Sequence, residues 1–233
     1  MGGWVNYLVF GWYPYVSLAF LLVGSRLRFS GDPHVRPDES GSLLARRHLT
    51  CGLVFFHFGI LVLFIGHLVG LLTPISVFEA IGMSHGFKQT TANVVGGTAA
   101  AFAFVGVAVL LRRRLAEARR RPESLAGDVA IMLLVLVQLA LGLASIAVAI
   151  ARYGDGCGAL PLMWWAESIA TLNPTAAVGY IADMPLVFKL HIVNGLAIVL
   201  VLPFTRLVNM WSVPIWCLDR YRKPSNLHLG AAE

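Results

Sequence analysis

The chain of 233 residues is too apolar for a soluble protein: hydrophobic residues make up 58% of it and charged residues 13%. An ordinary soluble domain carries about 25% charged residues. The mean hydropathy of +0.74 agrees, so we expect an all-α membrane protein that crosses the bilayer several times.

Charge-poor runs mark the expected membrane spans. A bilayer core about 30 Å thick is crossed by roughly 20 apolar helical residues. The first run is not expected to be a cleaved signal peptide, because no basic residue precedes it and no small-residue cleavage site follows. The whole chain, 1–233, is expected to be one integral-membrane bundle. The predicted spans are about 4–25, 50–72, 91–111, 129–151 and 186–208.

Lysine and arginine are distributed unevenly between the two expected membrane faces. One face has 15 of the 18, in the first and third connections and the C-terminal end. Cytoplasmic loops carry the excess of basic residues, so the N-terminus is predicted outside and the C-terminus in the cytoplasm. Because these basic residues set the orientation in the membrane, the net charge of +6 does not require a nucleic-acid partner. The segment 157–182 is expected to form an outer interfacial helix rather than a sixth span.

Three histidines fall within the spans: His57, His67 and His191. Ionisable groups at membrane depth are candidates for function, the alternative being hydrogen bonds that join helices. His57 and His67 are ten residues apart, which is about 15 Å of helix rise and leaves both in one sector. His67 and His191 are predicted at matching depth in the outer half, because their helices run in opposite directions.

Two neutral imidazoles that face each other between helices can serve as axial ligands of haem iron. Small residues near these histidines would leave room for the macrocycle. No CxxCH motif is present, so the haem is expected to be of b type. Zinc is less expected, because no carboxylate or thiolate stands near the histidines in sequence. The small residues are Gly59, Gly66, Gly70 and Gly195.

Six segments, in their order along the chain, resemble the gamma subunit of membrane-bound respiratory nitrate reductase. The resemblance implies a di-haem cytochrome b in the cell (inner) membrane that oxidises menaquinol or ubiquinol near the outer face. It also implies cytoplasmic partners, an iron–sulfur beta subunit and a molybdenum-containing alpha subunit. The segments are YPYVSLAFLLVGSRLR (13–28), FHFGILVLFIGHLVGLLTP (56–74), VVGG (94–97), LLRRRL (110–115), FKLHIVNG (188–195) and LPFTRLVNMWSVP (202–214).

The resemblance implies that His67 and His191 hold the outer haem and that His57 holds the inner one. The inner haem's second ligand in the family is a histidine at the position where this chain has Asn209. Three alternatives stay open. Met210 replaces that histidine as the iron ligand, His57 alone binds the inner haem with Asn209 hydrogen-bonding nearby, or the inner haem is absent.

The resemblance also implies a quinol site at Lys88, with Gly70 in its pocket. The alternative for Lys88 is a lysine that extends to the membrane surface. His85 is a candidate proton carrier, or simply a polar loop residue. Arg112, Arg113 and Arg114 are candidates to pair with a haem propionate, or they only anchor the third span at the cytoplasmic face.

Two other functions compete with this interpretation. Related haem b subunits serve other reductases, including those of the sulfur cycle. A small five-helix transporter is the alternative from another class, and it would be expected to carry paired acids or broken helices at the bilayer midplane. The 12 acidic residues lie in loops or near helix ends, which disfavours the transporter.

Overall fold

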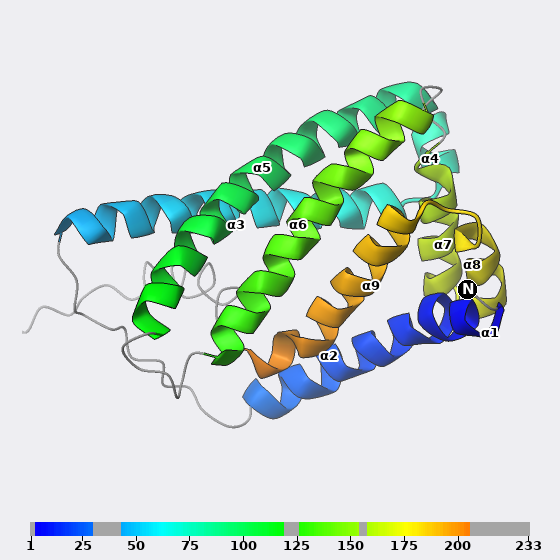
Figure 1. Ribbon diagram of the computed structural model, residues 1–233. Helices are drawn as coiled ribbons and strands as arrows, with labels where there is room; N and C mark the ends of the chain where they lie inside the picture. Colours follow the sequence, from blue (N-terminus) through cyan, green and yellow to red (C-terminus); the bar gives the residue numbers. More distant parts are fainter. Residues whose placement is uncertain (1–2, 30–42, 119–125, 154–157, 206–233) are drawn as a thin grey trace, which may run out of the picture.

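The computed structural model describes residues 3–29, 43–118, 126–153 and 158–205 (Figure 1). Within these ranges every regular element is a helix and no strand occurs. Five of the helical segments are long and apolar enough to cross a membrane. The prediction of an all-α protein with five spans is therefore confirmed.

The first span is interrupted near its start. It consists of α1 (Gly3–Asn6), the π-helical turn η1 (Tyr7–Trp12) and α2 (Tyr13–Phe29). Pro14 has no N–H to donate to the carbonyl of Phe10 one turn earlier. The indole Nε1–H of Trp165 donates to that carbonyl instead, at 3.0 Å. The sequence predicted one regular helix, and the proline explains the difference.

The next three spans are continuous α-helices: α3 (Leu43–Leu72), α5 (His85–Ala118) and α6 (Ala126–Arg152). Each contains the predicted span and extends beyond it at one or both ends. The prediction used the limits of the charge-free runs, whereas the helices continue into the polar residues that flank those runs. The last span begins as predicted at α9 (Leu186–Val201).

The predicted end of the last span, at about residue 208, lies outside the described residues, but the α-helix already ends before it. The α-helix ends at Val201 and a single 3₁₀ turn, η3 (Leu202–Phe204), follows. Pro203 lies in that turn and cannot donate a helical hydrogen bond. At Thr205 the backbone is extended, with φ −107° and ψ 163°, so the helix does not continue through this position.

The long helices follow one another in space as α3, α5, α6, α9 and α2, each packed on the next (Figure 1). Short helices gather at one end of this bundle, which we call the capped end: α1, α4 (Ile75–Ala80), α7 (Leu160–Ala170) and α8 (Pro174–Ile181) (Figure 1). An α-helix of 11 residues is about 16 Å long. In the described part of the predicted interfacial segment, 158–182, no helix is long enough for a sixth span, as predicted.

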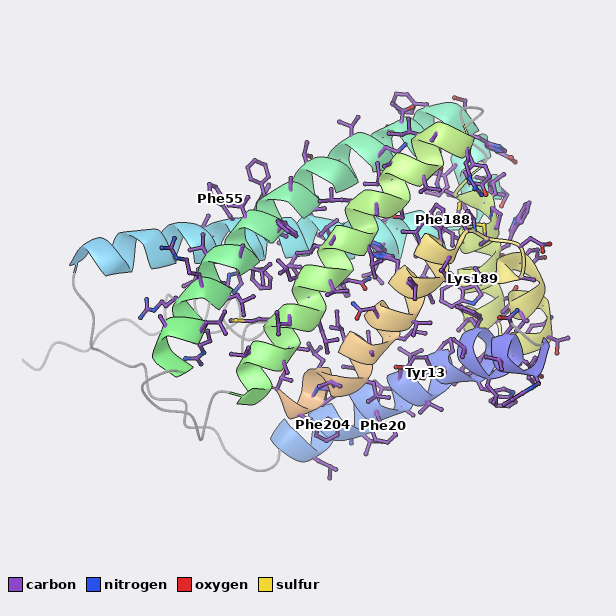
Figure 2. The ribbon with its side chains drawn as sticks, in the orientation of Figure 1. Tyr13, Phe20, Phe55, Phe188, Lys189 and Phe204 are labelled. Atoms are coloured by element: carbon purple, nitrogen blue, oxygen red, sulfur yellow. The ribbon has the colours of Figure 1, made fainter. Side chains whose placement is uncertain are left out.

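Large apolar side chains cover the outside of the bundle. Figure 2 shows Phe20, Phe55 and Phe204 on the outer surface, where they are 48%, 41% and 64% exposed. Exposed apolar surface of this extent marks contact with lipid or with other proteins. The chain is a membrane protein by this surface and by its five spans.

Glycines hold α3 and α5 in close contact. A Cβ added at Gly59 would lie 2.5 Å from the carbonyl oxygen of Ala99, and one added at Gly106 would lie 2.5 Å from the backbone nitrogen of Phe56. Small residues let membrane helices approach this closely. The sequence interpretation that Gly59 leaves room for a macrocycle is therefore wrong, because α5 fills that space.

Candidate functional site

The structure brings His67 of α3 and His191 of α9 together. Their ring centroids are 6.2 Å apart and the ring planes are inclined by 30°. Both residues lie close to the capped end, because His67 is near the end of α3 and His191 is in the second turn of α9. Helices α3 and α9 do not pack closely on each other. The two rings therefore approach each other across a gap between separate helices.

This spacing fits one metal ion between two imidazoles. A metal–imidazole bond is about 2.0–2.1 Å long, and the ring centre lies roughly 1 Å behind the nitrogen, so two rings on opposite sides of a metal have centres about 6 Å apart. The Nδ1 of His67 lies 2.7 Å from the carbonyl oxygen of Leu63. A carbonyl only accepts, so Nδ1 carries the proton and Nε2 keeps its lone pair for a metal.

A side chain of α6 contacts the ring of His191. The amide nitrogen Nε2 of Gln138 lies 3.2 Å from Nδ1 and 3.3 Å from Nε2 of that ring. Gly142, one turn further along α6, lies against the ring as well, since a Cβ there would be 3.2 Å from Cε1 of His191. The edge of the ring therefore fits against α6 where α6 has no side chain.

The other glycines near the histidines divide into two kinds. A Cβ added at Gly195 would lie 3.0 Å from Nε2 of Gln138, so Gly195 makes room for that amide and not for a macrocycle. Nothing lies within 4 Å of a Cβ added at Gly66 or Gly70. A Cβ at either position would meet open space, so the prediction that these two glycines leave room for a flat cofactor stays a prediction.

His57 has a free ring nitrogen. Its Nδ1 donates to the carbonyl oxygen of Leu53 at 2.6 Å, whereas its Nε2 is buried with no hydrogen-bond partner. A buried polar atom without a partner requires an explanation, and a metal bound to this nitrogen would supply one. Since α3 is unbroken between His57 and His67, the two are about 15 Å apart along the axis. Asn209 and Met210 lie outside the described residues.

Lys88 lies in the first turn of α5, at the capped end. Its Nζ donates to the carbonyl oxygen of Gly70 at 3.2 Å and lies 2.8 Å from Sδ of Met163. The ammonium is also 4.8 Å from the centre of the Phe78 ring. The structure thus joins Lys88 to Gly70, one turn beyond His67, as the sequence interpretation placed them.

Two further groups of predicted residues lie apart from the histidine pair. His85 contacts Glu79, with Nε2 and Oε1 3.0 Å apart; the Glu79 side chain is exposed and that of His85 is half-buried. Arg112, Arg113 and Arg114 lie near the end of α5 that is opposite the capped end. Arg112 is exposed, while the other two are half-buried and have interaction partners.

Comparison with known proteins identifies the family. The family model described as nitrate reductase gamma subunit matches residues 6–224. The chain belongs to the nitrate reductase gamma subunit family. The chain is 35% identical over 216 residues to the respiratory nitrate reductase 1 gamma chain of Escherichia coli, covering 93% of the chain and 95% of that relative. The match to the nitrate reductase gamma chain of Bacillus subtilis is 32% identical over 222 residues, covering 94% and 98%.

Sequence reasoning missed several residues of this gamma subunit's site. Gln138 carries an amide in the middle of an apolar span, and such side chains commonly join membrane helices; that signal was available in the sequence. Asn194, which hydrogen-bonds Gln138 at 2.9 Å, gave a similar signal. Met163 and Phe78 gave none, because their position beside Lys88 depends on how α7 and α4 pack.

Proposed function

We propose that this gamma subunit is a haem b membrane subunit that oxidises quinol at the capped end. Electrons would leave at the opposite end, to the iron–sulfur beta subunit and the molybdenum-containing alpha subunit of a nitrate reductase-type complex. The facing rings of His67 and His191, 6.2 Å apart, are the observation that carries this proposal. The names of the relatives, gamma chains of respiratory nitrate reductases, support the choice of complex.

The proposed orientation places the capped end and the N-terminus outside and the C-terminus in the cytoplasm. The supporting observation is the distribution of charge along the sequence, since 15 of the 18 lysines and arginines fall in the first and third connections between spans and in the C-terminal end, and cytoplasmic segments carry the excess of basic residues. The whole chain, 1–233, would form one domain in the cell (inner) membrane, with both partner subunits on the cytoplasmic face.

His67 and His191 would hold one haem near the outer face, and His57 would be a ligand of a second haem nearer the cytoplasm. A bound haem b supplies one-electron transfer. Met210 would be the second inner ligand, or His57 alone would bind the iron with Asn209 hydrogen-bonding nearby. Arg112, Arg113 and Arg114 lie at the end of α5 on the His57 side of the bundle, where a guanidinium would pair with a propionate.

Lys88 would donate a hydrogen bond to a quinol oxygen. A cation is disfavoured in the first turn of a helix, where the backbone N–H groups already carry positive partial charge. The ammonium of Lys88 nevertheless turns toward Gly70 and Met163, and its partners there are one carbonyl and one thioether. A thioether is a weak acceptor, so a quinol oxygen in its place would improve the pairing. His85 and Glu79 would then accept protons that quinol releases at this surface.

Substitution of Lys88 tests the quinol site, and Lys189 provides a matched control. Lys189 lies at the same end of the bundle (Figure 2), and its Nζ donates to the carbonyl oxygen of Ala182 at 2.6 Å. We expect Lys88→Ala to slow reduction of the haem by a quinol analogue at least tenfold while haem content stays constant. Lys189→Ala should leave both unchanged. Equal reduction rates in the two variants would remove Lys88 from the proposed site.

A further inference from the structure

Two hydrogen bonds hold the short helix α7 against the first span. The indole Nε1–H of Trp165 donates to the carbonyl oxygen of Phe10, and the hydroxyl of Tyr15 donates to the carbonyl oxygen of Ile169, each at 3.0 Å. Phe10, Trp165 and Ile169 are also buried in one apolar cluster. The partners in these bonds lie 155 and 154 residues apart in the chain, so the bonds fix the position of α7 relative to the first span.

Helix α7 depends on such contacts because it is short. It has 11 residues, fewer than the roughly 12–15 that an isolated helix needs to form in water. The last four carbonyls of a helix have no partner within it, and that of Ile169 is one of them, since α7 ends at Ala170. This carbonyl accepts from the backbone N–H of Leu172 at 3.1 Å, and its second lone pair accepts from Tyr15.

The opposite side of α7 reaches the ammonium of Lys88. Met163 and Trp165 are two residues apart, which is about 200° around the helix. Trp165 therefore faces the first span, whereas the buried side chain of Met163 has its Sδ 2.8 Å from Nζ of Lys88. The carbonyl oxygen of Gly70 in α3 accepts from the same Nζ at 3.2 Å, and α7 packs on α3. Lys88 is thus held where α3 and α7 meet.

Met163 holds Lys88 in a way that a quinol can replace. A thioether is a weak acceptor, so little is lost when a quinol oxygen takes its place beside Nζ. The side chain of methionine is unbranched and adapts to its surroundings, so Sδ can move aside. Without this contact the lysine side chain regains rotational freedom and can extend toward the membrane surface. Met163 therefore keeps the ammonium directed into the site before quinol arrives.

We infer that Tyr15 is a positioning residue for Lys88, and that it acts through α7 and Met163. This inference rests on the proposed function, in which Lys88 binds the quinol oxygen. Loss of the Tyr15 hydroxyl loosens the end of α7, and Met163 then no longer holds Nζ in place. Quinol binding weakens as a result, whereas the haem ligands on α3 and α9 are unaffected. A higher half-saturating quinol concentration with an unchanged limiting rate is the kinetic sign of lost binding alone.

The test uses the full complex with three single variants and one double variant. Tyr15→Phe removes the hydroxyl and keeps the ring, and Met163→Leu removes the sulfur with little change of volume. Tyr13→Phe is the matched control, because Tyr13 lies in the same span (Figure 2) and its hydroxyl makes no hydrogen bond to any described residue. Haem content is measured, together with the rate of haem reduction as a function of the concentration of duroquinol, a soluble quinol.

We expect Tyr15→Phe and Met163→Leu each to raise the half-saturating duroquinol concentration by about three- to tenfold, the range for loss of one modest polar contact. Haem content and the limiting rate should stay constant, and Tyr13→Phe should match the wild type. The double variant of Tyr15 and Met163 should be no worse than Met163→Leu alone, because two residues that act through one contact do not have additive effects.

The outcomes separate this inference from the proposed function. An effect in only one of the two single variants, a loss of haem in Tyr15→Phe, or effects that multiply in the double variant would overturn the inference. So would wild-type behaviour of both single variants, and in all these cases a slow Lys88→Ala variant would leave the proposed quinol site standing. Wild-type reduction kinetics in Lys88→Ala would instead overturn the proposed quinol site.

Discussion

Replacing Gly106 by alanine places a methyl group directly in the contact between α5 and α3. Its carbon would lie 2.5 Å from the backbone nitrogen of Phe56 and 2.8 Å from the carbonyl oxygen of Gly52. Close carbon–oxygen contacts between helices are about 3.3–3.6 Å, so the helices would have to separate by roughly 0.5–1 Å. The obstructing atoms belong to the backbone and cannot rotate aside.

The expected loss of stability follows from two opposing effects. Overpacking costs about 1–3 kcal/mol, and alanine in a helix recovers about 0.5–1 kcal/mol relative to glycine. From the middle of each range, the net loss is about 1.3 kcal/mol. For a chain of this size each kcal/mol lowers Tm by about 2–4 °C, so we expect a decrease of about 2.5–5 °C.

Gly96 provides the matched control for this prediction. It lies on the same helix, and nothing is within 4 Å of a Cβ added there, so Gly96→Ala should leave Tm unchanged or raise it. Both variants are to be heated at one rate in one detergent and followed by tryptophan fluorescence, because irreversible unfolding makes Tm depend on the heating rate. Equal Tm values for the two variants would refute the close packing of α3 on α5.

Two further predictions concern Trp165 and Gly66. Trp165→Phe removes the donor to the Phe10 carbonyl, which we expect to cost about 1–3 kcal/mol in thermal unfolding; a variant as stable as the wild type would show that this bond contributes nothing. Gly66→Leu enters the space beside His67 where nothing lies within 4 Å, so haem per chain, measured as the pyridine haemochrome, should fall below that of Gly96→Leu. Equal haem contents would show that Gly66 does not face the cofactor.

The spans were predictable because a charge-free run long enough to cross a bilayer has few alternatives to a helix. Their irregularities were harder to predict. Pro14 and Pro203 are visible in the sequence, but their consequences depend on partners elsewhere. Pro14 leaves the carbonyl of Phe10 without its helical donor, and Trp165, 155 residues away in the chain, donates a hydrogen bond to it instead. No local sequence pattern predicts that contact.

The positions of the site residues along their helices were predictable, but the directions in which their side chains point were not. Helix rise per residue is constant, so the positions of His67 and His191 along their helices follow from the sequence. Which side of a helix meets which neighbour depends on the packing of the whole bundle. For this reason the sequence misassigned Gly59, which faces α5, and Gly195, which faces Gln138. The approach of Lys88 to Gly70 followed from family resemblance rather than from any periodicity.

The central claim is that His67 and His191 ligate one haem between α3 and α9. The most direct measurement is the low-spin haem spectrum and the haem count of the purified wild-type complex, compared with the His67→Ala and His191→Ala variants. Each substitution is expected to remove the same bis-histidine signal and the same haem, since both rings would bind one iron. A wild-type subunit without haem, or survival of that same bis-histidine signal after either substitution, would contradict it.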